Sequence, residues 1–493
     1  MDFFQLSNLI PANPAMEIIT SIFTLTIIFI GIVIFFENDD PSKTLAWLLI
    51  LIFLPILGFF LYIFIGRKFR KIKRYKRKGM ENLAELSKII QEESQLITQG
   101  QDYVEKHIPH KKKLINLIVN SASSPFTINN KTLVLNNGHD TFKSFFEAIQ
   151  KAKHHIHLEF YIFRDDNIGT ELQKLLIKKA QEGVKVRLIY DGYGSLKLNK
   201  NFLTELEENG IQTACFSPVI LPIINNRINY RNHRKILIVD GKVGFLGGIN
   251  IGDEYLGKSK NFIYWRDTHL KIEGDAVKFL QHIFIQDWYF TTKEKINGFP
   301  MYYPTCKENI GEELMQIAAS GPDSPWESIM QMYFSMIATA EKTIYLTTPY
   351  FIPNESILMA IKNAALSGLD VRIIIPGKPD KRFVLWASMS YLKELLEAGV
   401  RVYQYQKGFI HSKTLVVDGL VSSIGTANMD LRSFKLNFEV NAFIYNKEVA
   451  RRLEQDFFAD LKDSKEISYY DYQERPLLLR FFESLARLFS PLL

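Results

Sequence analysis

The chain has 493 residues, of which 47% are hydrophobic and 23% charged, a composition that predicts two or three folded domains. Nine of its 60 basic residues lie in residues 67–78, where there is no acid, so the rest of the chain holds 51 basic against 53 acidic residues. This near-neutral remainder argues against a nuclease or a nucleic-acid-coating protein. The two cysteines, Cys215 and Cys306, share no motif, which excludes a thiolate metal site and fits a reducing compartment.

Two apolar stretches near the N-terminus contain no charged residue, Ile18–Phe36 and Leu45–Ile65. At about 1.5 Å per helical residue, each is long enough to cross a hydrocarbon core of roughly 30 Å. The sequence therefore predicts a two-helix transmembrane hairpin over residues 1–66. No positively charged segment precedes the first stretch, which argues against a cleaved signal peptide. Pro55 and Gly58 predict a kink in the second helix.

The basic run 67–78 directly follows the second stretch and opens a basic juxtamembrane helical linker, residues 67–110. By the positive-inside rule this side is cytoplasmic, so both termini and the catalytic part are expected on the cytoplasmic face of the cell membrane. A run of this density also attracts anionic lipid headgroups, at about 1 kcal/mol per cation near the surface. Setting topology and binding lipid are compatible roles, and the sequence leaves both open.

An α/β pattern follows and then repeats. In the first copy we expect a helix, strand, helix and strand at Thr141–Ala152, Ile156–Phe163, Gly169–Glu182 and Val184–Tyr190; in the second, a strand, helix and strand at Ile344–Ile352, Ser356–Ser367 and Leu369–Ile375. The repeat indicates an internal duplication, with a mixed sheet wrapped by helices in each half. The predicted division is a first half over residues 111–300, a connector over 301–330 and a second half over 331–475.

Each copy closes on the pattern H-x-K-x4-D followed by a glycine-containing turn and an asparagine. The residues that carry it are His233, Lys235, Asp240 and Asn250 in the first copy, and His411, Lys413, Asp418, Thr426 and Asn428 in the second. In an extended strand, residues two apart share a face, so each histidine should point with its lysine. Asp240 and Asp418 belong to the catalytic motif. A carboxylate at a strand end before glycine, however, more plausibly holds the backbone or a turn than takes part in the chemistry. Asn250, Thr426 and Asn428 are expected to bind the substrate phosphate.

Two such copies brought face to face suit phosphoryl chemistry. One imidazole can attack phosphorus, while the other protonates the leaving alkoxide and then deprotonates the incoming alcohol. The lysines supply fixed positive charge, so we expect neither a metal nor a cofactor. A histidine nucleophile needs a carboxylate to fix its tautomer, and Asp267 and Glu439 are the candidates downstream of the two copies.

Other features allow more than one interpretation. We interpret His154, His155 and His157 as strand-surface residues rather than as a metal cluster, and His269 as a weaker catalytic candidate.

Phe216–Asn229, present only in the first copy, is a substrate-covering loop or a long connection. Residues 476–493 form an amphipathic helix. Its wide apolar face predicts a second membrane contact, and docking on the second half is the alternative.

The duplicated motif resembles the phospholipase D superfamily and, more narrowly, the bacterial cardiolipin synthases. The narrower resemblance is carried by Asp40–Trp47, Glu159–Asp166, Asn229–Lys235 and Asn428–Phe434. It implies a duplicated phospholipase D-like α/β fold and the condensation of two phosphatidylglycerols into cardiolipin and glycerol through a phosphatidyl-histidine.

The resemblance also implies residue roles. His233 would be the nucleophile and His411 the general acid and base, with Glu439 serving His233 and Asp267 serving His411. The chain departs from the family at Gly248, where many members carry a hydroxyl residue, so one hydroxyl contact to phosphate is missing there.

The expected partners are phosphatidylglycerol and other anionic membrane lipids, with no nucleic acid. A membrane phospholipase D hydrolase, or a phosphatidyltransferase with an acceptor such as serine, would carry the same motifs. The motifs do not distinguish the acceptor, the acyl chains or the oligomeric state. A membrane scaffold without catalysis would not need two intact copies.

Overall fold

The computed structural model describes residues 14–36, 41–62, 112–122, 124–219, 229–259, 262–296, 299–304 and 309–490. The basic run and linker, Cys306 and most of the Phe216–Asn229 segment lie outside the described residues. The N-terminal helices belong to one compact unit and the α/β body to another.

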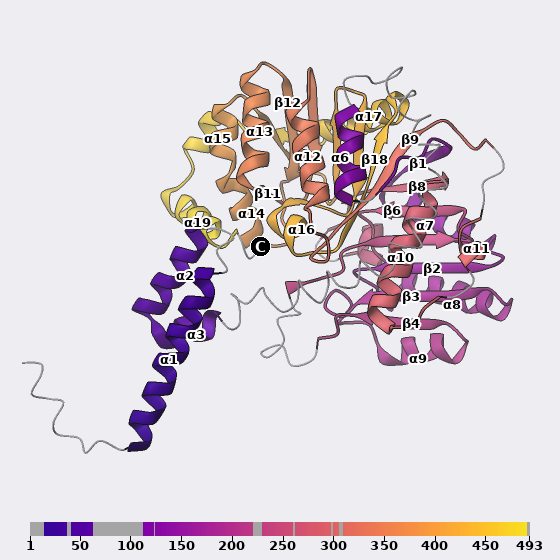
Figure 1. The fold of residues 1–493 in the computed structure, drawn as a ribbon. Helices are drawn as coiled ribbons and strands as arrows, with labels where there is room; N and C mark the ends of the chain where they lie inside the picture. The colour runs from indigo at the N-terminus through magenta and orange to yellow at the C-terminus, as the bar shows by residue number, and fades with distance from the viewer. Residues whose placement is uncertain are drawn as a thin grey trace, which may run out of the picture. The chain divides into compact units, whose positions relative to one another are not determined.

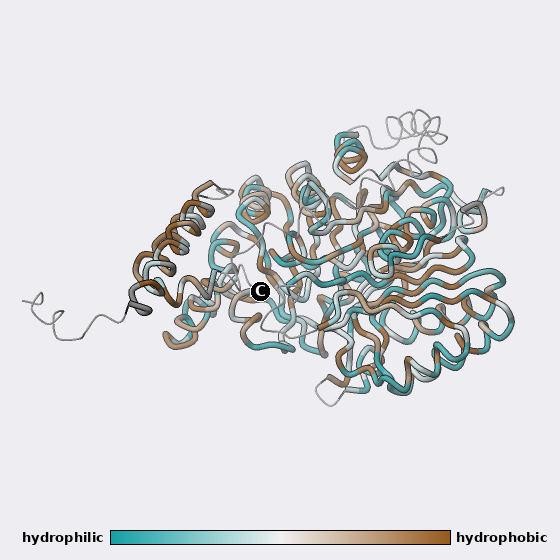
Figure 2. The backbone as a smooth tube through the Cα atoms, turned by 60° about the horizontal axis from the view of Figure 1, so that its bottom comes forward, coloured by the Kyte–Doolittle hydropathy of each residue, from teal (hydrophilic) through white to brown (hydrophobic). Residues whose placement is uncertain are grey.

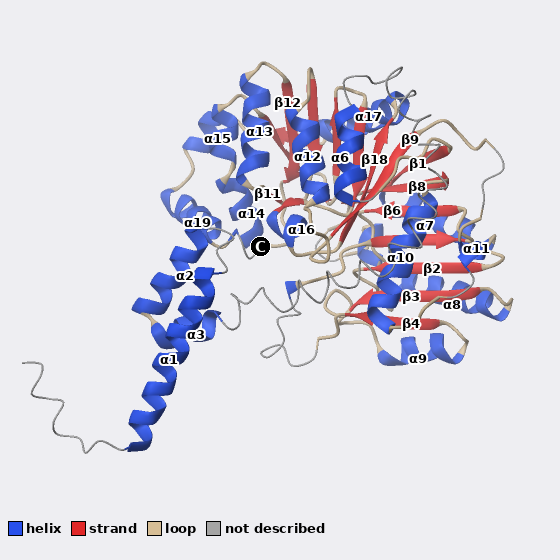
Figure 3. Ribbon diagram, viewed as in Figure 1, coloured by secondary structure: helices blue, strands red, loops and turns tan. Residues whose placement is uncertain are grey.

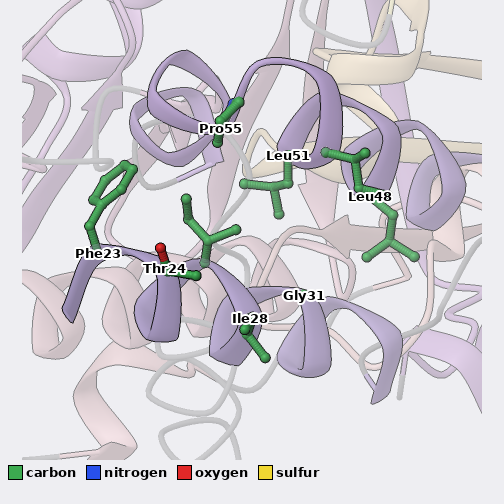
Figure 4. A pocket seen from close by; sticks show the side chains of 9 residues that line it. Phe23, Thr24, Ile28, Gly31, Leu48, Leu51 and Pro55 are labelled. Carbon is green, nitrogen blue, oxygen red and sulfur yellow. The ribbon is translucent and has the colours of Figure 1, made fainter. Parts of the chain in front are cut away.

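The N-terminal unit is a helical hairpin. Its helices are α1 (Pro14–Phe36), α2 (Pro41–Phe53) and α3 (Pro55–Leu61). Ile30, Ile34 and Leu51 are buried between them, and an apolar cavity of about 460 Å³ lies between α1 and α2 (Figure 4). Figure 2 shows how continuously hydrophobic these helices are.

The second apolar stretch is broken at Leu54, which leaves the helical region just before Pro55. This confirms the predicted kink, because a proline ring disfavours helical geometry at the preceding residue. No helix in the described ranges combines the length and the hydropathy that a membrane crossing requires. The transmembrane hairpin therefore stays a prediction.

The α/β body contains two sheets of matching topology (Figures 1 and 3). The first sheet has the order β1-β8-β6-β5-β2-β3-β4 and the second β19-β13-β12-β10-β15-β16-β18-β9. In each sheet three parallel strands, β2-β3-β4 or β10-β12-β13, adjoin an antiparallel set that begins with β5 or β15. The predicted duplication is confirmed strand for strand, and β19 is an addition at the edge of the second sheet.

The strands of the first sheet are β1 (Asn130–Asn136), β2 (His155–Phe160), β3 (Lys185–Asp191), β4 (Gln212–Phe216), β5 (Lys235–Val239), β6 (Val243–Gly247) and β8 (Thr268–Gly274). Those of the second are β9 (Leu314–Ser320), β10 (Thr343–Thr347), β12 (Asp370–Pro376), β13 (Arg401–Tyr405), β15 (Thr414–Val417), β16 (Val421–Gly425), β18 (Glu439–Tyr445) and β19 (Ser464–Glu466). Short parallel pairs join β7 (Trp265–Arg266) to β14 (Phe409–Ile410) and β11 (Phe351–Ile352) to β17 (Met429–Asp430).

Helices cover both faces of each sheet, because the strands are apolar on both sides. One core cluster packs the first sheet against α7 (Asn137–Gln150), α8 (Asn167–Gln181) and α9 (Lys200–Glu208). Another packs the second sheet against α6 (Lys112–Ala122), α12 (Ser328–Ala338), α13 (Glu355–Leu366), α14 (Arg382–Ser390) and α15 (Leu392–Glu397). A third, shared by the halves, contains α10 (Val277–Thr292) and α17 (Lys447–Lys462). The short helices are η5 (Asp253–Leu256), α11 (Phe299–Tyr302), α16 (Leu431–Lys435) and α18 (Tyr469–Gln473).

Two segments belong to a different half from the one predicted. α6, which opens the predicted first half, packs on the second half: Leu114, Ile115 and Ile118 are buried in the α12 and α13 cluster, and Figure 1 shows α6 beside α12. The predicted connector contains β9, which pairs with β18 at the edge of the second sheet. β9 thus repeats the place of β1, which pairs with β8.

The interpretation of His155 and His157 as strand-surface residues is wrong. Both are fully buried, because α10 and α11 cover the sheet face to which they point. The Gln281 side-chain amide joins the two imidazoles by hydrogen bonds of 3.0 and 2.8 Å, and the Phe284 ring stacks on His157 at 4.3 Å. Burial lowers the pKa of His155 to about 4. The two rings are neutral packing groups.

The C-terminal helix α19 (Leu477–Leu488) docks on the second half. The Phe482 ring stacks on Trp386 of α14 with centroids 5.0 Å apart, and Phe489 lies 6.0 Å from Phe383. One face of the helix therefore packs on the body, as the alternative interpretation of this segment expected.

Candidate active site

The aspartates of the two motifs form tight hairpin turns. Asp240 and Gly241, between β5 and β6, both have positive φ, as do Asp418 and Gly419 between β15 and β16. Each turn closes with a 3.0 Å backbone hydrogen bond, from Lys242 to Val239 in the first copy. An Asp-Gly pair is the preferred sequence for this two-residue turn, which needs positive φ at both central positions.

The two carboxylates also hold the neighbouring strands. Asp240 accepts hydrogen bonds from the backbone N–H groups of Lys153, His154 and His155 at 2.7–2.9 Å, where β2 begins. Asp418 does the same where β10 begins, at 2.8–3.2 Å. These contacts confirm that both aspartates bind backbone N–H groups of a neighbouring strand.

The motif histidines lie in extended segments just before β5 and β15, not on the strands themselves. Each segment forms backbone hydrogen bonds with the other half. The His233 N–H donates to the Phe438 carbonyl at 2.9 Å, and the His411 N–H donates to the Arg266 carbonyl at 2.7 Å. The residue after each of these carbonyls is a candidate acid, so this pairing places the histidine of one half beside the acid of the other.

Each imidazole pairs through Nδ1 with that acid. His233 Nδ1 lies 3.0 Å from both carboxylate oxygens of Glu439, and His411 Nδ1 lies 2.7 Å from Oδ2 of Asp267. Both acids are fully buried. The sequence predicted these four residues and, through the family resemblance, this crossed pairing. Engagement of Nδ1 leaves Nε2 of each ring for chemistry.

The motif lysines fold back toward their histidines. Lys235 Nζ donates to the His233 carbonyl at 2.6 Å, and Lys413 Nζ donates to the His411 carbonyl at 2.5 Å. Both are almost completely buried. Burial lowers the pKa of Lys235 to about 7 and that of Lys413 to about 8. Two ammonium groups held in such surroundings are a strong, preorganised attraction for a phosphate.

The charged groups of the two halves act on one another. Burial, partly offset by Glu439, lowers the pKa of His233 to about 4, and both Lys235 and Lys413 contribute. Burial and Lys413 lower the pKa of His411 to about 3, with a further contribution from Lys235. Each imidazole is thus close enough to the lysine of the other half for its pKa to be lowered, which agrees with the crossed contacts to Glu439 and Asp267.

The carboxylates stay ionised in spite of their burial. Burial acts to raise the pKa of Asp267, but His411 and Lys413 outweigh it and hold that pKa below its usual value. Burial likewise acts to raise the pKa of Glu439, but His233, Lys235 and the Thr426 hydroxyl hold that pKa below its usual value. An ionised carboxylate can therefore stabilise each imidazole as it takes up a proton.

The two copies differ beside their acids. The Thr426 hydroxyl donates to Oε2 of Glu439 at 2.5 Å and accepts from the Val440 N–H at 2.9 Å. In the first copy a Cβ at Gly248 would lie 1.9 Å from Oδ1 of Asp267. The departure at Gly248 thus has a steric reason. The Asp267 carboxylate, whose side chain is shorter than that of Glu439 in the second copy, occupies the space that a hydroxyl side chain at position 248 would need.

The motif asparagines are also engaged within the protein. Asn250 accepts from the Ile162 N–H at 3.0 Å and donates to the Tyr255 hydroxyl at 2.8 Å. Asn428 donates to Asp430 at 3.1 Å. These contacts fix the chain around the centre. Phosphate binding by Asn250, Asn428 and Thr426 stays a prediction.

Several supporting residues escaped the sequence analysis. The Asp191 carboxylate accepts from the Asn232 N–H at 3.0 Å, which fixes the segment before His233. Arg234 donates to the Glu439 carbonyl at 3.2 Å, and Arg266 donates to the Asp267 carbonyl at 2.5 Å. A guanidinium thus supports the backbone of each acid. The position of Arg234 between His233 and Lys235 was the available signal, but its partners are more than fifty residues away.

Aromatic rings pack against both histidines. The Tyr161 ring lies 5.0 Å from His233, and the Trp265 ring lies 5.3 Å from His411. His269, the weaker candidate, is fully buried and packs 5.3 Å from the Phe145 ring. It forms no pair with either acid among the described contacts, and burial lowers its pKa to about 3.

The sequence is similar to those of known proteins. Residues 145–288 and 333–461 match the family described as cardiolipin synthase, PLD-like domain, and residues 24–67 match the phospholipase D-nuclease N-terminal family. A cardiolipin synthase of Alkalihalophilus pseudofirmus is 48% identical over 472 residues, which cover 96% of this chain and 93% of that protein. The chain belongs to the cardiolipin synthases of the phospholipase D superfamily.

A second relative agrees with this assignment, and a solved structure shares the fold. A cardiolipin synthase of Geobacillus kaustophilus is 49% identical over 468 residues, covering 95% of this chain and 92% of that protein. The crystal structure of a phosphatidylserine synthase from Haemophilus influenzae aligns with a TM-score of 0.58 at 16% identity, over 78% of this chain and 100% of that one. This last likeness shows the shared fold.

A change at Thr426 distinguishes a role in positioning Glu439 from direct phosphate binding. We expect Thr426→Val to lower kcat of this cardiolipin synthase about 10- to 100-fold, because a hydrogen bond to a charged group contributes about 1.5–3 kcal/mol. Thr426→Ser keeps the hydroxyl and should retain most activity. Steady-state kinetics on both variants provide the measurement. A normal kcat with a raised KM in Thr426→Val would show instead that the hydroxyl binds substrate.

The lysine pKa values predict the alkaline limit of activity. Lys235 and Lys413 carry charge below their pKa values of about 7 and 8 and lose it above them. The value of kcat/KM, which reports the free enzyme, should therefore fall as pH rises through this range. Lys235→Arg should move the fall to higher pH, because a guanidinium stays protonated. An unchanged alkaline limb in Lys235→Arg would contradict this assignment.

Proposed function

We propose that this enzyme transfers the phosphatidyl group of one phosphatidylglycerol to the glycerol hydroxyl of a second, and so forms cardiolipin and glycerol. The observation that carries the proposal is the pair of crossed imidazole–carboxylate contacts, 3.0 Å at His233 and 2.7 Å at His411. They present two Nε2 atoms and two buried ammonium groups in one centre. The names of the relatives supply the substrate class.

In the first step, His233 Nε2 attacks the phosphorus of the donor lipid. A P–N bond forms while the P–O bond to the headgroup glycerol breaks. His411 Nε2 gives its proton to the departing glycerol alkoxide. In the second step, the neutral His411 takes the proton of the acceptor hydroxyl, whose oxygen attacks phosphorus and displaces His233. Two phosphatidylglycerols thus yield one cardiolipin and one glycerol, and His411 recovers its proton.

The charges of the site fit these steps. In the free enzyme the pKa of each imidazole lies well below neutrality, at about 4 for His233 and about 3 for His411, so His233 is neutral and ready to attack. The negative phosphodiester opposes the effect of the two lysines and raises the pKa of His411, which favours its protonated form. Lys235 and Lys413 stabilise the charge that develops on the phosphate oxygens, and no step requires a metal or a cofactor.

We assign the reaction to the cytoplasmic face of the cell membrane. The apolar stretches Ile18–Phe36 and Leu45–Ile65 support anchoring through a two-span hairpin, as does the match of residues 24–67 to the N-terminal family. In the described part of the hairpin, Phe29, Phe36 and Phe53 are 65%, 82% and 75% exposed. A surface of this kind suits lipid. The basic run 67–78 supports a cytoplasmic position of the body, because of the positive-inside rule, and suits binding to anionic headgroups.

Product analysis tests the proposal. The purified full-length protein, reconstituted with labelled phosphatidylglycerol as the sole substrate, should release glycerol and cardiolipin in equal amounts. His233→Ala, purified in parallel, controls for any host enzyme. Phosphatidic acid as the main product would favour the hydrolase alternative. Phosphatidylserine formed when serine is added would favour another acceptor.

The same reaction, quenched without acid, assigns the nucleophile. We expect the phospho-adduct on His233 when peptides are mapped by mass spectrometry. Without this adduct the role of His233 is wrong, and an adduct on His411 would exchange the two roles.

A further inference from the structure

The C-terminal helix α19 has three distinct sides. The side formed by Phe482, Ala486 and Phe489 packs toward α14. A second side is polar, with Arg480, Glu483, Ser484 and Arg487. Between them runs an apolar strip whose members recur at the spacing of one helix face.

This apolar strip is exposed. Its members, defined here as the α19 strip, are Leu477, Leu478, Phe481, Leu485 and Leu488. Leu477, Leu478, Phe481 and Leu488 are 79%, 67%, 62% and 77% exposed. It is the docking side, not this strip, that packs on the body. Packing within the body therefore does not explain why the strip is apolar. An exposed strip of large hydrophobic side chains indicates a contact.

The exposed charged side chains of α19 itself are all positive. Glu483, the only acid of α19, is only 3% exposed and forms a 2.7 Å ion pair with Arg475. Arg480 and Arg487 are exposed on the polar side, and Arg487 also forms a 3.1 Å ion pair with Glu394. At the C-terminal end of the strip, Phe489 packs on Phe383, next to the exposed Lys381 and Arg382 at the start of α14. Cations therefore flank the apolar side chains at both ends.

The segment before α14 also connects to the active centre. The Asp380 carboxylate accepts a 2.6 Å hydrogen bond from the Tyr350 hydroxyl. Burial is the largest effect on the pKa of Lys413 and lowers it, and Asp380 is among the carboxylates that raise it. The helix pair α14–α19 is thus attached to the side of the centre that carries His411.

We propose that the α19 strip is a second membrane contact, in which the helix lies in the interface of an anionic bilayer. Helices of this kind bury their apolar side about 5–10 Å into the boundary between headgroups and acyl chains, while cations bind anionic headgroups. The flanking cations favour this occupant over a second copy of the chain, which would bring these same cations against each other. This inference rests on the proposed function only in that both place the enzyme at a phosphatidylglycerol-containing membrane.

A depth-quenching experiment on the full-length protein tests the contact. Phe481→Cys, in a Cys215→Ser and Cys306→Ser background, takes an environment-sensitive fluorophore and is reconstituted into bilayers containing phosphatidylglycerol. Shallow-brominated lipid should quench more than half of the emission and deep-brominated lipid less. Leu133→Cys, in the same background, is the matched control. Leu133 is 54% exposed on the edge strand β1, and its label should keep its emission.

Each outcome decides the proposal. Absence of quenching at position 481, equal quenching at 133 and 481, or equal quenching when phosphatidylcholine replaces phosphatidylglycerol would overturn it. A disulfide-linked dimer through unlabelled position 481 in detergent, without lipid quenching, would assign the strip to a second copy. Products are measured in the same vesicles. Cardiolipin without quenching refutes the contact alone, whereas quenching without cardiolipin refutes the proposed function alone.

Discussion

The crossed contact between a histidine of one half and an acid of the other is the interaction on which the site depends. The His233–Glu439 and His411–Asp267 pairs span 206 and 144 residues of sequence. Backbone hydrogen bonds from each histidine to the residue before the opposing acid set both pairs at once. Neither half alone can orient its own imidazole. The duplication therefore does more than repeat a fold, because it supplies each copy with the carboxylate that the other copy needs.

The motif divides into parts with different physical roles. The histidine and lysine bring an imidazole and a buried ammonium group to the centre. The aspartate, five residues beyond the lysine, forms the left-handed turn that reverses the strand and secures the neighbouring strand through three N–H groups. Loss of Asp240 or Asp418 would thus act through the backbone, whereas loss of a histidine removes a reacting group.

Much of this was predictable from the sequence, because the duplication repeats local spacing and the motif residues lie close together in the chain. The failures concern contacts between distant segments. His155 and His157 alternate like surface positions, and only the docking of α10 buries them. α6 is apolar on one face, but nothing local shows that this face packs on the second half. The hydrogen bond from the Thr426 hydroxyl to Glu439, thirteen residues away, was also not predicted, because the spacing of the motif does not show which side chains meet.

The turnover of three variants tests whether the two halves form one composite centre. The measurement is kcat for His233→Ala, His411→Ala and the double variant, with folding checked by their melting temperatures. If both imidazoles serve one reaction, each single variant loses nearly all turnover, and the double variant loses no more than the worse single one. If either single variant keeps about half of the activity and the two losses combine in the double variant, the halves act independently and do not form one composite centre.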